Sequence, residues 1–304
     1  MKKVLAIDVG GTKISYSIIN ENGEFLEEVN KTSTPKDIDE LIKIFKEIIS
    51  NNENKVDMIS FATAGAVNLE NTKVDSSTPN LPKGYNDIDF SKLSTKPVYV
   101  ENDANAAAWA EYKVGAAIGD RNIIIITLGT GVGGGFIVDG KMLRGKSGRA
   151  GEVGSMKINS KGRICTCNRK DCFESYASGT GLKYTAEEIA STDEIFKTSM
   201  FKDKTPQEVT TYDIVNGLKQ NDKYSKLVFK TWKNDLITGL IGIVNIFDPD
   251  SIVISGGMGE FIDTNEIEEK INSEIVVSPI KIKLAKAGNY SGMIGAALLA
   301  TEKY

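Results

Sequence analysis

Two stretches of the sequence repeat one local design, in which an apolar strand runs into a turn rich in glycine and threonine and a second strand follows. They are residues 4–13 and 123–135, and the second has five glycines between positions 129 and 135. Glycine lets the backbone approach a ligand closely, and threonine hydroxyls with backbone N–H groups bind anionic oxygens. A simple hairpin needs only one or two glycines, so a pair of ordinary turns is the weaker alternative. The repeated design predicts two lobes that hold a polyphosphate between them.

The order of expected elements is repeated as well. Hydrophobic periodicity predicts strands at 3–9, 13–20, 24–33, 56–62 and 97–100, with helices at 38–49 and 104–114. The second half predicts strands at 122–128, 134–138, 141–144, 251–255 and 280–285, with helices at about 222–247, 259–273 and 292–301. Three antiparallel strands followed by alternating helix and strand, occurring twice, indicate a duplicated α/β fold. We expect one lobe from 1–117 with 289–304 and the other from 118–288.

Composition excludes several classes of partner. The chain has 304 residues and a net charge of −4, which gives no electrostatic case for nucleic acid. Its apolar runs are too short for a membrane helix, and the first ends at Asp8, too early for a signal peptide. Three clustered cysteines indicate a thiol or metal site in a reducing cytoplasm. The chain has no histidine, so proton transfer must use a carboxylate, lysine, tyrosine or cysteine.

Polar residues stand at the ends of two expected strands. Asp8 precedes the first glycine turn, where a carboxylate can hold hydrated Mg²⁺, although it could also cap the turn. Glu101, Asn102 and Asp103 follow one another before an alanine-rich helix. A helix start needs only one capping residue, and α/β folds place their chemistry at strand ends. The three residues therefore indicate more than a cap.

Five motifs, in family order, resemble those of the ROK family (repressors, open reading frames and sugar kinases). They lie at 8–13, 101–106, 128–135, 151–154 and 165–174, and the resemblance extends from residue 3 to the end. It implies the two-lobed actin/hexokinase-like (ribonuclease H-like) ATPase fold and an ATP- and Mg²⁺-dependent kinase acting on the 6-hydroxyl of a hexose or N-acylhexosamine. N-acetylmannosamine is the first candidate and glucose the runner-up. A sugar-sensing ROK repressor is the remote alternative, because we expect no room for a helix-turn-helix before the first strand.

The resemblance also implies site residues. Asp103 would be the general base for the sugar hydroxyl. The sugar ligands would be Gly65, Thr78, Asn80, Asn102, Asp103, Glu152, Ser155 and Glu174. The ATP-binding residues would be Asp8, Gly10, Gly11, Thr12, Lys13, Thr130, Gly131, Gly133, Gly134, Gly256 and Gly257. The alternative for Glu152 and Glu174 is a solvated surface position. Family precedent suggests a cytoplasmic homodimer.

The match breaks at the zinc motif of the family. Cys165, Cys167 and Cys172 remain, but the usual histidine is replaced by Ser155. Structural zinc takes four protein ligands, so three thiolates leave one position open. Asp171 or water could complete the set, and a metal-free thiol cluster is at least as well supported. We expect zinc to be absent or weakly bound.

Two further departures concern the backbone of the same loop. The glycines usual at positions 168 and 171 are asparagine and aspartate here. Without a closed zinc site, the loop 155–175 must be ordered mainly by packing. We expect Ile164, Phe173 and Tyr176 to supply that packing.

Overall fold

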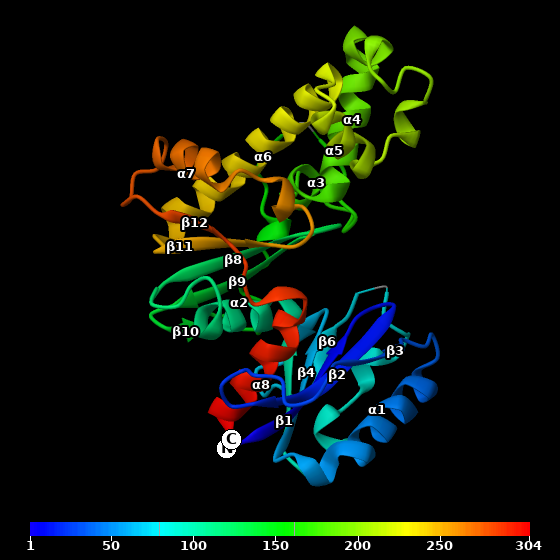
Figure 1. Cartoon of the computed structure of the whole chain (residues 1–304), viewed down its shortest axis with the longest axis vertical. Coiled ribbons are helices and arrows are strands. Elements are labelled where there is room, and N and C mark those ends of the chain that lie inside the picture. Colours follow the sequence, from blue (N-terminus) through cyan, green and yellow to red (C-terminus); the bar gives the residue numbers. More distant parts are fainter. Residues whose placement is uncertain (79, 161) are drawn as a thin grey trace. The chain divides into compact units, whose positions relative to one another are not determined.

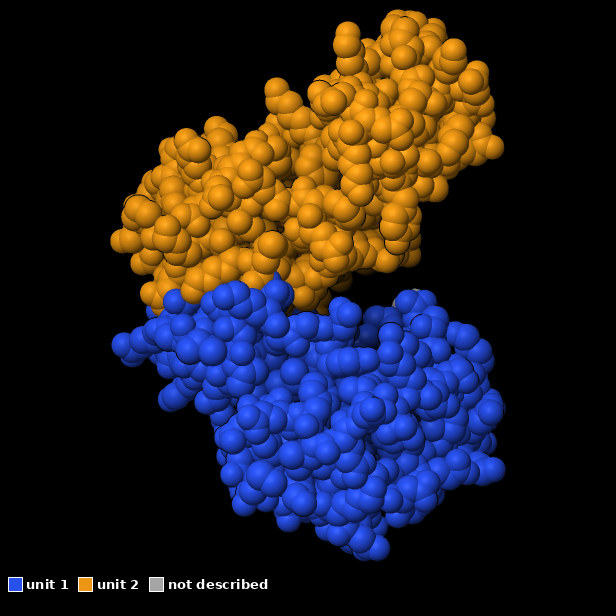
Figure 2. Space-filling view, viewed as in Figure 1, with its two compact units in different colours: residues 1–125, 135–151, 285–304 blue, residues 126–134, 152–284 orange. Residues whose placement is uncertain are grey.

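The computed structural model describes residues 1–78, 80–160 and 162–304 (Figure 1). The chain forms two compact units, coloured separately in Figure 2. Unit 1 comprises residues 1–125, 135–151 and 285–304, and unit 2 comprises residues 126–134 and 152–284. The lobe boundaries expected from the sequence assign residues 118–125, 135–151 and 285–288 to the second lobe, whereas these residues lie in unit 1. A physical reason is that Gly135 lies against Ala104 and Ala108, where a side-chain carbon would be 2.6 Å from the Ala108 Cβ.

Two five-stranded sheets repeat one strand order, which confirms the duplicated α/β fold. The first has the order β3-β2-β1-β4-β7 and the second β10-β9-β8-β11-β12. The strands of the first are β1 Lys3–Val9, β2 Lys13–Asn20, β3 Asn30–Ser33, β4 Met58–Thr63 and β7 Val98–Asn102. Those of the second are β8 Ile123–Leu128, β9 Val132–Val138, β10 Lys141–Met142, β11 Ser251–Ser255 and β12 Lys281–Leu284. A small hairpin pairs β5 Ala66–Val67 with β6 Val74–Ser76.

Eight α-helices are described in residues 1–78, 80–160 and 162–304. They are α1 Ile38–Asn52, α2 Asp103–Val114, α3 Glu174–Ala177, α4 Gly179–Thr192, α5 Thr211–Lys219, α6 Lys223–Phe247, α7 Thr264–Asn272 and α8 Ser291–Lys303. Over the described residues, no helix combines the length and apolar character needed to cross a membrane.

The two faces of the first sheet are covered differently. Large side chains such as Ile7 and Phe61 share a core with Phe45 of α1. On the other side small residues meet, where Ala62 of β4 packs with Ala106 of α2 and Ala296 of α8. Helices α2 and α8 pack against each other in unit 1 (Figure 1). Small side chains therefore let the alanine-rich helix α2 lie close to β4 and α8.

Helix α6 forms the core of unit 2 with the segment that follows the cysteines. Trp232 is fully buried and its Nε1 donates to the Ser178 carbonyl at 2.9 Å. The Phe173 ring packs so closely on Gly239 that a side-chain carbon there would lie 2.3 Å from it. Glycine at 239 thus lets α6 approach Phe173.

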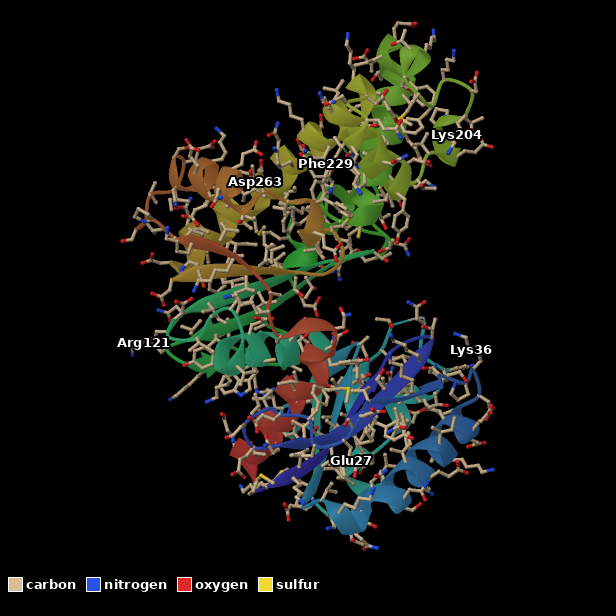
Figure 3. All side chains as sticks on the ribbon, in the orientation of Figure 1. Glu27, Lys36, Arg121, Lys204, Phe229 and Asp263 are labelled. Carbon is tan, nitrogen blue, oxygen red and sulfur yellow. The ribbon has the colours of Figure 1, made fainter. Side chains whose placement is uncertain are left out.

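Several expected elements are shorter in the structure, and side-chain hydrogen bonds explain two of them. The strand expected at 24–33 is only Asn30–Ser33, because side chains take up earlier backbone groups. Ser17 Oγ donates to the Glu27 carbonyl at 2.7 Å, and Asn20 Oδ1 accepts from the Glu24 N–H at 3.0 Å. The helix expected at 259–273 is split, since Asp263 (labelled in Figure 3) accepts from the backbone N–H groups of residues 265 and 266 and starts α7.

Candidate functional site

The turn between β7 and α2 carries the candidate catalytic residues. Asn102 is the N-cap of α2, because its Oδ1 accepts from the N–H groups of Ala104 and Asn105 at 3.0 and 3.1 Å. Its Nδ2 donates one hydrogen to the Gly65 carbonyl at 2.9 Å. Gly65 has φ +112°, and a side-chain carbon would lie 2.3 Å from the Ser76 carbonyl. Asn102 is therefore both the structural cap and the connection to the Gly65 turn.

Glu101 lies beneath this turn as a buried carboxylate, 1% exposed. Its Oε2 accepts from Arg144 Nη2 at 2.7 Å and from the Tyr99 hydroxyl at 2.9 Å. Its Oε1 accepts from the Asn102 N–H at 3.0 Å and from Asn105 Nδ2 at 3.3 Å. The charge is thus paired and hydrogen-bonded, as a buried carboxylate requires. Sequence reasoning missed Arg144 and Tyr99, because no local sequence pattern shows that these side chains bind Glu101.

Asp8 and Asp103 form a pair of neighbouring carboxylates in unit 1. Burial and the charge of Asp103 raise the pKa of Asp8 from 3.8 to about 6, and Lys13 opposes this. Asp103 begins α2, and its Oδ1 accepts from the Ala104 N–H at 2.8 Å. Two carboxylates that repel each other favour a cation between or beside them. Oxygen ligands of this kind fit Mg²⁺.

The first glycine loop is folded onto a second predicted site segment. The Gly10 N–H donates to the Lys13 carbonyl at 3.0 Å, and Thr34 Oγ1 donates to the Gly10 carbonyl at 2.6 Å. At Gly11 a side-chain carbon would lie 2.7 Å from the Asn80 Cβ. Lys36, labelled in Figure 3, donates to the Asn80 carbonyl at 3.4 Å. Glycine at position 11 thus allows the predicted phosphate loop and the predicted sugar segment to lie side by side.

The second glycine loop is held by Glu174 in unit 2. Glu174 Oε2 accepts from the Val132 N–H at 3.1 Å, and a side-chain carbon at Gly131 would lie 2.1 Å from that oxygen. Thr180 Oγ1 donates to the Thr130 carbonyl at 2.8 Å. Sequence reasoning predicts Glu174 as a sugar ligand, and the structure places its carboxylate against the second glycine loop.

Two other predicted segments contact the same loop or the strand before it. At Gly154, between Glu152 and α3, a side-chain carbon would lie 2.2 Å from the Val132 carbonyl. At Gly256, which has φ +88°, it would lie 2.4 Å from the Leu128 carbonyl. Glu152 is exposed and Ser155 half-buried, at either end of one short turn in which the Ser155 N–H donates to the Glu152 carbonyl at 3.1 Å.

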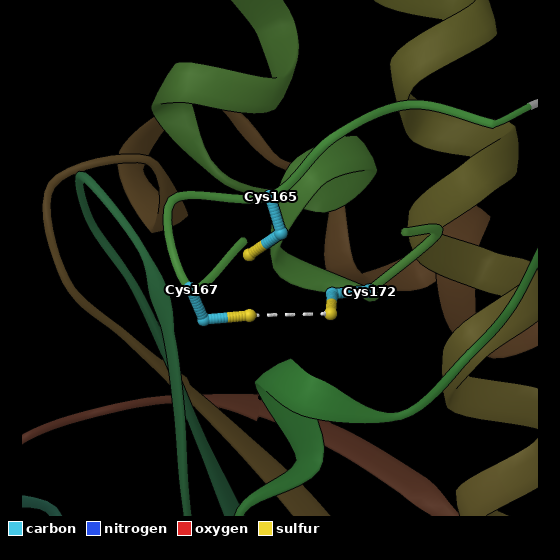
Figure 4. A group of neighbouring side chains, drawn as sticks. All are labelled: Cys165, Cys167 and Cys172. Atoms are coloured by element: carbon cyan, nitrogen blue, oxygen red, sulfur yellow. Dashed lines mark hydrogen bonds between the residues drawn. The ribbon is translucent and has the colours of Figure 1, made fainter. Parts of the chain in front are cut away.

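The three cysteines converge, as Figure 4 shows. Their sulfur atoms all lie within 4.8 Å of one another, and Cys167 Sγ is 3.7 Å from Cys172 Sγ. Cys165 and Cys172 are buried, and Cys167 is exposed. Burial raises the pKa of the Cys172 thiol to about 12 and also raises that of Cys165, which opposes the thiolate form that a metal needs.

The backbone conformation explains why asparagine and aspartate can stand at positions 168 and 171 in place of the usual glycines. Asn168 and Asp171 have φ values of +62° and +64°, the left-handed region in which asparagine and aspartate are the best tolerated residues after glycine. Asp171 Oδ1 also accepts from the Tyr176 hydroxyl at 2.6 Å and from the Gly162 N–H at 2.8 Å. These bonds engage Asp171 in ordering its own loop.

The cysteine set does not fit a closed zinc site. Among the residues that the structure describes, the metal-ligand group contains three thiols and no fourth donor. Asp171 is committed to the bonds above. The expected packing by Phe173 and Tyr176 is found, because both are fully buried, but Ile164 is 62% exposed and the expectation for it is wrong. Ile164 forms an isolated bridge with Lys170 in an outer turn, which leaves its side chain in solvent.

Comparison with known proteins identifies the family. The model of the ROK family matches residues 4–303. A glucokinase of Streptomyces coelicolor is 30% identical, with 99% of this chain and 98% of the relative covered. An N-acetylmannosamine kinase of Vibrio cholerae is 35% identical over 66% of this chain and 72% of the relative. A ROK glucokinase of Streptomyces griseus, solved with glucose and AMPPNP, has a TM-score of 0.78 and 28% identity, with 99% of each chain covered.

These matches agree with the duplicated sheet order and with motifs that the structure brings together within each unit, and they establish the actin/hexokinase-like fold. The chain therefore belongs to the ROK family, among relatives that are sugar kinases.

Proposed function

We propose that this protein is an ATP-dependent kinase that phosphorylates the 6-hydroxyl of a hexose or N-acylhexosamine. The observation that carries the proposal is the pair Asp8 and Asp103 at neighbouring strand and helix ends, beside a glycine loop. Phosphoryl transfer needs a cation near the phosphates and a base near the attacking hydroxyl, and the pair supplies one carboxylate for each.

Each residue has one task in this proposal. Asp103 accepts the proton of the sugar hydroxyl, and Asn102, fixed by its cap and by Gly65, orients the sugar. Asp8 holds Mg²⁺, which when bound neutralises phosphate charge. Backbone N–H groups of the two glycine loops bind the phosphates of ATP, for which the AMPPNP complex of the Streptomyces griseus relative gives support. Glu152, Ser155, Thr78 and Asn80 contact the sugar.

We propose N-acetylmannosamine as the substrate, with glucose as the second candidate. Serine at 155 is smaller than the imidazole usual in the family, and in this proposal the shorter side chain faces the 2-acetamido group of the sugar. The Vibrio cholerae kinase supports this assignment. Glucose is supported by the glucokinase of Streptomyces coelicolor, which matches nearly the whole chain. We further propose a cytoplasmic homodimer on family precedent.

A coupled ADP-release assay tests the proposal. N-acetylmannosamine, glucose, N-acetylglucosamine and mannose are compared at equal concentrations with Mg²⁺ and ATP. We expect the highest kcat/KM with N-acetylmannosamine and a kcat lower by roughly 10²–10⁴-fold with Asp103→Asn protein. A higher kcat/KM with glucose would assign the protein to the second candidate. Sugar binding without ADP release from any sugar would contradict a kinase and favour a sugar-sensing role.

A further inference from the structure

The cysteine cluster has the geometry of a dithiol pair beside a third thiol. Cys167 Sγ and Cys172 Sγ are 3.7 Å apart, and Cys167 is exposed to solvent. Within the described part of the chain the cluster has no fourth metal donor, and the chain has no histidine. The three sulfur atoms therefore lack the fourth ligand of a closed metal site, but they are close enough for two of them to form a disulfide.

The same cluster is connected to the second glycine loop through one carboxylate. Thr166 Oγ1 donates to Glu174 Oε1 at 3.0 Å, and Cys165 Sγ lies 3.5 Å from the same oxygen. The other oxygen of Glu174 accepts from the Val132 N–H at 3.1 Å. Residues 165 and 166 thus hold Glu174 in the position from which it supports residues 129–134.

We propose that Cys167 and Cys172 are a reversible oxidation site, and that their disulfide weakens the hold of Glu174 on the glycine loop. The oxidant is hydrogen peroxide. Its O–O bond breaks as Cys167 sulfur takes one oxygen to become a sulfenic acid, and the other oxygen leaves as water. Cys172 sulfur then bonds to Cys167 sulfur, and the sulfenic oxygen leaves as a second water with the Cys172 proton. Two thiols are oxidised and one peroxide is reduced; a dithiol restores both thiols.

Bond formation displaces the exposed side of the cluster. A disulfide places the two sulfurs about 2 Å apart, so they must approach. Cys172 is fully buried and directly precedes Phe173, which is packed against Gly239, so it is fixed. Cys167 lies in a tight turn in which the Asn168 N–H donates to the Cys165 carbonyl at 2.9 Å. The turn therefore moves relative to Cys172, and this changes the positions of Thr166 and Cys165 against Glu174.

The first test counts and maps thiols in the full-length protein, and its result does not depend on kinase activity. Purified protein is treated with hydrogen peroxide, alkylated and digested, and disulfide peptides are identified by mass spectrometry. We expect loss of two of the three thiols, a bond between Cys167 and Cys172, and full recovery with dithiothreitol. Cys165→Ser, the matched control, keeps this bond, and Cys167→Ser abolishes it.

Three outcomes of that test would overturn the site. They are oxidation of Cys167 to sulfinic acid without a disulfide, a bond from Cys165 instead, and stoichiometric zinc that survives EDTA and protects all three thiols. The zinc content of the same preparation is measured by atomic emission, and we expect well under one zinc per chain with little effect of chelator on melting temperature.

The second test concerns the glycine loop and rests on the proposed kinase function. Each protein is compared with itself before and after oxidation in the ADP-release assay. Loss of a hydrogen bond of this kind changes binding by about 2- to 10-fold, so we expect the KM for ATP to rise by that factor in the wild type. The sugar KM changes less, dithiothreitol reverses the effect, and Cys167→Ser shows none. An equal rise in Cys167→Ser protein would overturn the coupling. A mapped disulfide in a protein without kinase activity would refute the proposed function but leave the oxidation site intact.

Discussion

The two units support their candidate loops with carboxylates of different character. In unit 1, Glu101 is fully buried and paired with Arg144. In unit 2, Glu174 is half-buried, and it accepts hydrogen bonds from three neutral groups, the Val132 N–H, the Thr166 hydroxyl and the Cys165 thiol. A buried charge that loses its partner is costly, whereas a partly exposed carboxylate can turn to water. The turn between β7 and α2 is therefore rigidly held, whereas the second glycine loop is held in a way that can be released.

The largest expected effect lies in the rigid turn of unit 1. Asp103→Asn keeps the bond-accepting oxygen but removes the base, so kcat should fall by roughly 10²–10⁴-fold, the usual contribution of general acid–base catalysis. Sugar binding, followed by calorimetry, should change little, and the melting temperature should not fall. Turnover near that of the wild type would remove Asp103 from this role and leave the turn with a structural task only.

The largest difference in stability between variants of the two units is expected when Glu101 loses its charge partner, Arg144. Arg144→Met leaves the Glu101 charge buried and unpaired, so the free energy of unfolding in urea should fall by about 3–5 kcal/mol. The double variant Arg144→Met with Glu101→Gln should recover most of that loss. Glu174→Gln in unit 2 should cost about 1 kcal/mol or less. Similar losses for Arg144→Met and Glu174→Gln would contradict the proposed difference between the two carboxylates.

A third prediction concerns the raised pKa of Asp8, whose larger cause is burial and whose smaller cause is the charge of Asp103. The folded state raises the pKa of Asp8 from 3.8 to about 6, so it binds a proton more tightly than the unfolded chain does. The free energy of unfolding therefore falls as the pH rises from about 4 to about 6, and the full cost is present above that range. Asp8→Asn should remove this cost and raise stability at pH 7.5 by up to about 3 kcal/mol, with no gain near pH 4.

Urea unfolding at the two pH values, without Mg²⁺, measures this effect. Asp103→Asn is the matched control, because it removes the smaller, coulombic cause and should give a smaller gain with the same pH dependence. A destabilised Asp8→Asn protein at pH 7.5 would show that the Asp8 carboxylate stabilises the turn and does not strain it.

The smallest effect is expected in the releasable loop of unit 2. Gly131→Ala places a carbon 2.1 Å from the present position of Glu174 Oε2, so the carboxylate must move and the KM for ATP should rise about tenfold. Gly129→Ala is the control in the same loop, because its added carbon meets nothing within 4 Å. The sugar KM is measured in parallel. Equal losses for both ligands in Gly131→Ala protein would indicate a folding defect.

Much of the fold could be predicted from local patterns. The periodicity of residues 3–9, 13–20 and 251–255 gave strands at those positions, and the long helix at 222–247 is α6 Lys223–Phe247. Prediction failed where side chains intercept backbone groups, as Ser17 and Asn20 do beside the strand expected at 24–33. It also failed for Ile164, because the neighbouring residues in the sequence do not show that this apolar residue lies in an outer turn without a packing partner.

The sequence by itself determined the duplicated fold, the two glycine loops and the row Glu101, Asn102 and Asp103 at a strand end. These depend on residue type and short spacing, which local chemistry limits. Only the tertiary structure decided which carboxylate supports which loop. Arg144 reaches Glu101 across 43 positions and Val132 reaches Glu174 across 42. Such pairs are selected by packing and by the need to satisfy buried charges, and neither leaves a periodic trace in the chain.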